Sequence, residues 1–176
     1  MNEPVVISLI PLSLEYHVAA LTAVYQAVRN YWAFYHLLAS LPGQAEHDLR
    51  LAASTPGRQI MGIVRRLDRD QSSSGAELIG MVDFRQHWPG AHVVSVGMFM
   101  VVETLHRQGI GRQAWALLEP WLCETAKMHK ARVGVEQFNP IALQFFASLG
   151  FQLTGQTDRH RVGAKFVRLL YLEKEW

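Results

Sequence analysis

The chain has 176 residues, of which 49% are hydrophobic and 18% charged, with a formal net charge of +2. This composition can form a core, so it excludes a disordered or fibrous chain, and the length predicts one domain over residues 1–176. The small net charge gives no reason to expect a nucleic acid or a membrane as a partner.

The first third of the chain is predicted to be helical apart from one strand. Residues 5–10 are typical of a strand, and apolar residues then recur at helical spacing over 14–28. A second helical piece, 31–39, is rich in aromatic residues and ends before Leu41-Pro42-Gly43. A short amphipathic stretch follows at 48–53.

Three antiparallel strands are predicted next, at 59–67, 77–87 and 93–102. The polar run 70–75 predicts a hairpin loop between the first two strands. Trp88-Pro89-Gly90-Ala91 has the turn chemistry that returns the chain into the third strand.

The C-terminal half alternates helices and strands. A helix is predicted over 109–130 with a kink at Pro120, then a strand at 132–137, a helix at 140–149 and a strand pair at 151–157 and 166–172. This order predicts an α/β fold, with a mixed, mostly antiparallel sheet of about seven strands and helices on both faces.

Location in the cell is constrained by two further features. Cys123 is the only cysteine, so no internal disulfide can form, which fits a reducing cytoplasm. The apolar run 5–10 lacks the basic flank and length of a signal peptide, and no apolar stretch reaches the roughly 18 residues of a membrane span. We therefore expect a cytoplasmic protein.

A glycine-rich turn between the strand at 93–102 and the following helix is the first segment that could carry chemistry. Glycines at this turn let the backbone approach a ligand, and the first N–H groups of the helix lack internal partners. Such a helix start can hold a pyrophosphate, with Arg107 and Arg112 as supporting cations. Tight packing alone is the alternative interpretation of the turn, whose sequence is His106-Arg107-Gln108-Gly109-Ile110-Gly111.

A second segment, residues 139–151, is explained locally by helix capping. Asn139 is a typical N-cap, Pro140 suits the first helical position, and Gly150 suits the C-terminal cap. Capping does not explain why this segment follows the glycine turn by one helix and one strand.

Together the two segments, 101–112 and 139–151, resemble the signature motifs of the GNAT superfamily of acetyl-CoA-dependent N-acetyltransferases. The resemblance implies that acetyl-CoA is the cosubstrate. Its pyrophosphate would bind the backbone of Arg107, Gln108, Gly109, Ile110, Gly111 and Arg112, and its pantetheine arm would pair with the main chain of Val101 and Val102. The arm would enter where two parallel strands, those at 93–102 and 132–137, splay apart, with Asn139 and Phe146 beside it.

Catalytic groups are harder to assign, because direct attack by an amine needs a base and often an acid for the thiolate. The family's usual acid, a Tyr seven positions after the Asn, is Phe146 here, and its usual base positions hold Ser95 and Gly97. The base must come from elsewhere: Asp83 and Glu136 are the main candidates, and His87 and His92 are further ones. Glu103 replaces a frequent proline, and His106 a usual Gln or Arg.

The acceptor side is described less sharply by the sequence. In this family the early helices usually form one wall of the acceptor pocket, and the residues here that would do so suit an apolar or aromatic amine. Aromatic residues at helical spacing are more often part of the core, which is the alternative interpretation. The residues are Tyr25, Tyr31, Trp32, Phe34, Tyr35 and His36. The eight histidines show no metal-ligand spacing, so no metal is expected.

Two functions therefore stay in competition. The first is an N-acetyltransferase that modifies a primary amine on a small molecule or a protein N-terminus. The second is an acyl-CoA-binding domain of the same fold with little or no turnover. The basic C-terminal residues are interpreted as a solvated face rather than a nucleic-acid site, and a homodimer is compatible with the sequence.

Overall fold

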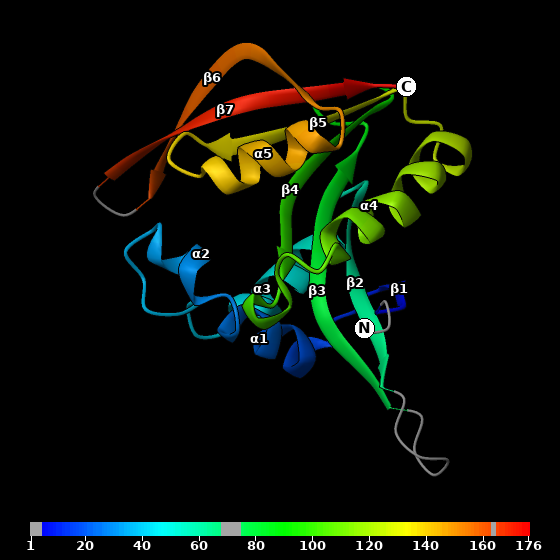
Figure 1. The fold of residues 1–176 in the computed structure, drawn as a ribbon, viewed down its shortest axis with the longest axis vertical. Helices are drawn as coiled ribbons and strands as arrows, with labels where there is room; N and C mark the ends of the chain where they lie inside the picture. The colour runs from blue at the N-terminus through cyan, green and yellow to red at the C-terminus, as the bar shows by residue number, and fades with distance from the viewer. Residues whose placement is uncertain (1–4, 68–74, 163–164) are drawn as a thin grey trace.

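The computed structural model of the protein describes residues 5–67, 75–162 and 165–176 (Figure 1). The predicted hairpin loop at 70–75 lies outside these residues except for Gly75, which begins a strand. Within the described part of the chain, no helix is both long and apolar enough to cross a membrane.

Seven strands form one mixed sheet in the order β1-β2-β3-β4-β5-β7-β6. Neighbouring strands are antiparallel except for β4 and β5, which are parallel. The predicted fold class is thereby confirmed. The strands are β1 (Ile7–Pro11), β2 (Arg58–Leu67), β3 (Gly75–Gln86), β4 (Val93–Val101), β5 (Lys130–Glu136), β6 (Gln152–Val162) and β7 (Lys165–Glu175).

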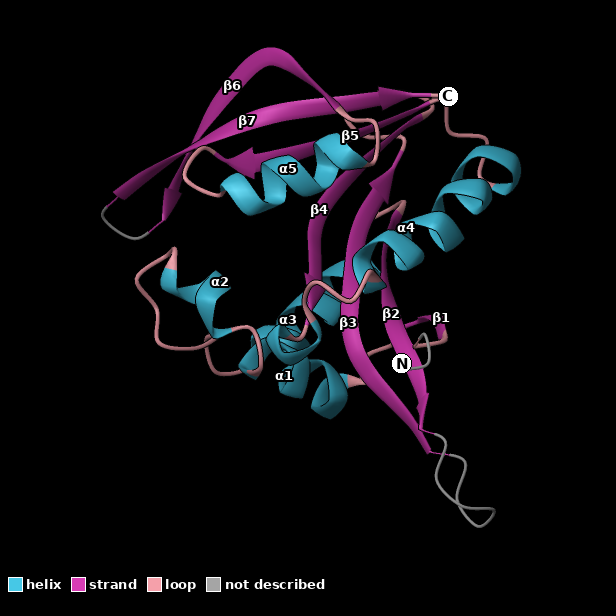
Figure 2. Ribbon diagram, in the orientation of Figure 1, coloured by secondary structure: helices cyan, strands magenta, loops and turns pink. Residues whose placement is uncertain are grey.

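Helices cover both faces of the sheet, as Figure 2 shows. One face packs on α1 (Val18–Gln26), α2 (Arg29–Ala33) and α3 (Gln44–Ser54) through a cluster that includes Ile60 and Met81. The other packs on α4 (Ile110–Pro120) and α5 (Pro140–Ser148) through Val82 and Val94. Side chains that alternate along the strands supply both clusters, as the period of two requires.

The pairing of β4 with β5 stops early. Only four residue pairs join them, from Val93 with Lys130 to Val96 with Val133. Both strands continue past this point without pairing each other, over residues 97–101 of β4 and 134–136 of β5. Figure 1 shows the two strands turning apart, and we call this unpaired region the β4–β5 divergence. It is the splay that the family resemblance implied.

The helices differ from the predicted ones mainly in length. The aromatic segment expected at 31–39 contributes only the end of the short helix α2. The single helix expected over 109–130 ends at Pro120, and a π-helical turn, η2 (Trp121–Thr125), follows. Proline has no N–H for the i→i−4 ladder, and the next turn widens so that Ala126 donates to the Trp121 carbonyl five residues back.

β4 is held close to β3 at a glycine that tolerates no side chain. A Cβ on Gly80 would lie 2.3 Å from the carbonyl oxygen of Met100, so Gly80→Ala should push β4 away. We expect a loss of about 1–3 kcal/mol in the free energy of unfolding, measured by urea denaturation. Gly90→Ala is the matched control, because a Cβ there meets nothing within 4 Å and should change stability by less than about 0.5 kcal/mol. Equal effects of the two substitutions would contradict this packing.

Candidate functional site

The glycine turn leaves backbone donors open at the start of α4. Arg107 and Gly109 take left-handed backbone angles, with φ of 60° and 79°. The helix ladder begins with the bond from the Gln113 N–H to the Gly109 carbonyl, so the N–H groups of residues 110–112 precede it. No side chain caps this helix. The turn therefore presents several N–H groups to an anion.

The second glycine of the turn lets α4 lie against α5. A Cβ on Gly111 would sit 3.0 Å from the ring of Phe145. The guanidinium of Arg112 also reaches α5, donating to Oγ of Ser148 at 3.1 Å. Arg112 is therefore engaged at the end of α5, whereas the side chain of Arg107 is exposed beside the turn.

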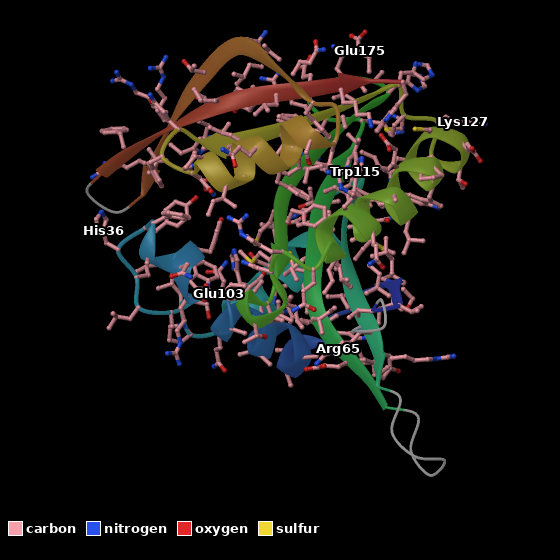
Figure 3. All side chains as sticks on the ribbon, in the orientation of Figure 1. His36, Arg65, Glu103, Trp115, Lys127 and Glu175 are labelled. Carbon is pink, nitrogen blue, oxygen red and sulfur yellow. The ribbon has the colours of Figure 1, made fainter. Side chains whose placement is uncertain are left out.

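The segment before the turn is fastened to the early helices. It forms a short 3-10 helix, η1 (Glu103–Leu105), labelled at Glu103 in Figure 3. The Glu103 carboxylate accepts the N–H of Asn30 at 2.5 Å, in the first turn of α2. This residue, which stands where a proline is frequent, thus links the glycine turn to the helix that carries Tyr31.

Val101 and Val102 differ in what their main chains offer. The N–H of Val102 donates to the Ile79 carbonyl on β3, and its own carbonyl accepts the N–H of Leu105. Because backbone groups alternate along a strand, those of Val101 face the opposite edge, toward the β4–β5 divergence. The structure brings Val101, but not Val102, to the open edge.

His106 already occupies the open carbonyl of Val101. Its Nε2 lies 2.7 Å from that oxygen. No sequence pattern indicated this contact, in which the His106 ring folds back onto a carbonyl five residues earlier in the chain. The alternation of β4 also turns the main chain of Phe99 to the same edge, which strand register could have predicted.

Asn139 and Phe146 are both buried, at 8% and 4% exposure. Asn139 caps α5 as predicted, with Oδ1 accepting the Ala142 N–H at 3.2 Å. Phe146 packs edge-on to the rings of Phe99, Phe145 and Phe151. The position of the usual acid is thus part of an apolar cluster.

Asp83, one of the two main base candidates, is held in an ion pair. Both of its oxygens accept from Arg58, with Nε to Oδ1 at 3.0 Å and Nη2 to Oδ2 at 2.5 Å. This contact raises the pKa of Arg58. Asp83 also lies beside Gly97, one of the usual base positions, since a Cβ built on Gly97 would be 3.8 Å from the Asp83 carbonyl oxygen. Its contacts favour a structural role.

Glu136, the other main candidate, lies at the end of β5 within the divergence. It is 8% exposed, and its Oε1 accepts a hydrogen bond from the hydroxyl of Tyr35. Burial, with added effects of Tyr31 and Glu136, raises the pKa of Tyr35 well above its ordinary value. Burial and the Glu136 charge raise the pKa of Tyr31 to about 12. Both phenols therefore keep their protons at neutral pH.

The two histidine candidates lie at the other end of β4. The rings of His87 and His92 are 5.6 Å apart, and His92 stacks on His129 at 4.6 Å. Gly97 lies five residues along the chain from His92, or roughly 16 Å in an extended strand. A hollow of about 550 Å³ opens there, lined by Ala91, His92, Val93, His129, Lys130, Glu175 and Trp176. These groups do not reach the divergence.

The aromatic residues of the early helices fall into two groups, one buried in the core and one half-buried near the end of β5. Tyr25 and Trp32 are buried, at 0% and 7% exposure, in the cluster beneath α1 and α3. Tyr31 and Tyr35 are half-buried with ring centroids 5.4 Å apart, and Phe34 contacts Phe138 just after β5. No group of metal-binding side chains occurs within the described ranges.

Comparisons with known proteins agree with this geometry. A model of the acetyltransferase (GNAT) family matches residues 23–151. An acetyltransferase from Thermus thermophilus is similar in structure, with a TM-score of 0.75 at 19% identity over 99% of this chain and 100% of that one. The PaiA N-acetyltransferase from Thermoplasma acidophilum, solved in complex with coenzyme A, has a TM-score of 0.66 at 15% identity, covering 97% of this chain and 99% of that one. Curated proteins yield no match.

A further similar structure is that of mutant forms of the spermidine/spermine N-acetyltransferase SpeG from Vibrio cholerae. It has a TM-score of 0.67 at 12% identity, covering 97% of this chain and 95% of that one. Identities this low show a shared fold and say nothing of a shared substrate.

Substitution of Asp83 tests whether this residue has a structural role or a catalytic one. Asp83→Asn leaves Arg58 without its buried countercharge, so we expect a loss of up to about 3 kcal/mol in the free energy of unfolding, measured by urea denaturation. Glu77→Gln breaks the more exposed pair with Arg65 and should cost less than about 1 kcal/mol. A stable Asp83→Asn protein that has lost all turnover would instead make Asp83 the base.

Proposed function

Because the chain belongs to the acetyltransferase (GNAT) family, we propose that it transfers an acetyl group from acetyl-CoA to a primary amine. The observation that carries this proposal is the β4–β5 divergence beside the uncapped start of α4. One feature offers an open strand edge to an extended arm, and the other offers N–H groups to a pyrophosphate.

In this proposal the turn binds the donor. The N–H groups of residues 107–112 hold the pyrophosphate of CoA, helped by the helix dipole and the Arg107 side chain. The pantetheine arm lies in the divergence and pairs with the main chain of Val101. Its amide would take the place of the His106 ring at the Val101 carbonyl.

Glu136 is the base that we assign. It lies on the diverging part of β5, and its carboxylate forms no salt bridge with any described side chain, whereas Asp83 is neutralised by Arg58. An ammonium gives one proton to Glu136, and the neutral nitrogen attacks the thioester carbon. The C–N bond forms to give a tetrahedral intermediate, which loses its second N–H proton to water, and the C–S bond then breaks to release the amide and the CoA thiolate.

Neither nearby tyrosine is suited to protonate the departing thiolate. A thiol pKa near 8.5 makes the thiolate a weaker base than either phenolate, since the pKa of Tyr31 is about 12 and that of Tyr35 is also raised. Phe146 has no proton to give. The thiolate would therefore leave without a general acid and take its proton from water. A general acid typically raises the rate of such a step by about 10²–10⁴-fold.

The absent acid also favours a second candidate function. A chain that lacks the usual Tyr at position 146 and a titrating group at Ser95 and Gly97 could hold acyl-CoA without turning it over. Calorimetry with CoA and acetyl-CoA, combined with release of CoA thiol from acetyl-CoA in the presence of amines, separates the two. Binding without release supports the binding module, and absence of binding contradicts both.

Replacement of the proposed base tests the catalytic assignment. We expect Glu136→Gln to lower kcat/KM for the amine by about 10²–10⁴-fold, because the isosteric amide cannot accept the ammonium proton. Thiol release measured against amine concentration gives this ratio. CoA affinity from calorimetry should stay unchanged, since the proposed donor contacts are main-chain groups of Val101 and of the turn, which this substitution does not alter. An unaltered kcat/KM would remove Glu136 from the mechanism.

A further inference from the structure

Glu136 is a buried carboxylate that has no positive partner among the described side chains. Its residue is 8% exposed, and its carboxylate accepts a hydrogen bond from the neutral hydroxyl of Tyr35. No Lys, Arg or His with a described side chain, over residues 5–66, 75–161 and 166–176, forms a salt bridge with it. Buried carboxylates are rare unless paired, so Glu136, without a cation among the described side chains, is a candidate partner for the cation of a ligand.

The other two buried carboxylates in the described part of the chain are satisfied. Asp83 forms its ion pair with Arg58. Asp48 accepts hydrogen bonds from the Tyr25 hydroxyl at 2.8 Å and the Gln44 amide at 3.0 Å. Among these three, Glu136 is therefore the buried negative charge left to attract a positive ligand.

One aromatic side chain contacts this charge, and others lie next to it in the chain or against it in space. Tyr35 bonds to Glu136 directly, and Tyr31 contacts Tyr35 at a ring angle of 64°. Phe34 on one side and Phe138 on the other meet at 5.6 Å, which joins the end of α2 to the segment that follows β5. Phenol and phenyl rings carry no charge but attract cations with their faces and accept apolar groups.

Resting on the acetyltransferase function proposed above, we propose that the acceptor is a monoamine whose ammonium pairs with Glu136 and whose body is aromatic or otherwise apolar. One carboxylate without a salt bridge matches one ammonium, and the neighbouring aromatic side chains match an apolar body. A polyamine would bring a second charge for which no second free carboxylate lies buried among the described residues, and a peptide would bring polar amides.

The test compares amines of different chemistry on the full-length protein. Phenethylamine, cyclohexylmethylamine, spermidine and an unblocked tripeptide are each supplied with acetyl-CoA, and released CoA thiol is measured. We expect kcat/KM for the two apolar monoamines to exceed that for spermidine and for the tripeptide by at least about tenfold. Spermidine or the tripeptide acting equally well would overturn the inference while supporting acetyl transfer.

Binding gives a readout that does not need turnover. Calorimetry with CoA present should show phenethylammonium binding, weakened by about tenfold or more in Glu136→Gln, because the charge it pairs with is gone. The uncharged 2-phenylethanol should bind no better to the native protein than to this variant. Glu175→Gln is the control, an exposed carboxylate that Figure 3 shows across the molecule from His36, the neighbour of Tyr35.

The outcomes separate the two proposals. Phenethylammonium that binds through Glu136 without any thiol release would overturn acetyl transfer and support the cation site. Thiol release without any effect of Glu136→Gln on amine binding would overturn the cation site and support transfer. Loss of both would overturn both.

Discussion

The four-residue parallel contact between β4 and β5 is the constraint on which the rest of the site depends. Parallel strands normally hydrogen-bond along their length, and here the pairing stops at Val96 and Val133 although both strands run on. Residues 97–101 and 134–136 are left with strand edges that face each other unpaired. α4 follows β4 through only η1 and the glycine turn, so the uncapped helix start comes shortly after the open strand edge in the chain.

The two faces of the sheet contribute different parts of the site around this divergence. α4 and α5 pack on one face, where Gly111 and Phe145 bring the helices together and fix the glycine turn. α1 to α3 pack on the other, where Tyr35 reaches Glu136. Glu103 connects the sides, since it follows β4 and caps the first turn of α2. The Glu103 carboxylate thus links the segment before the proposed donor turn to the helix beside the proposed acceptor site.

Sequence patterns predicted the fold well because strand alternation and helix periodicity are local signals. They indicated the seven strands in order, the strand-turn-helix with its glycines, and the Asn139 cap. They failed where distant residues decide the outcome. Nothing near Asp83 in the sequence indicates Arg58, 25 residues away, and nothing near Glu136 indicates Tyr35, 101 residues away. The choice between the two base candidates therefore needed the structure, as did the finding that His106 covers the Val101 carbonyl.

The central claim is that the divergence and the glycine turn together form the CoA site, and a crystal structure of the protein with CoA tests it most directly. We predict pyrophosphate oxygens about 3 Å from the N–H groups of residues 110–112, with pantetheine between β4 and β5 and the His106 ring moved off the Val101 carbonyl. CoA bound elsewhere, such as the hollow beside His92 and His129, with the divergence empty, would contradict the account.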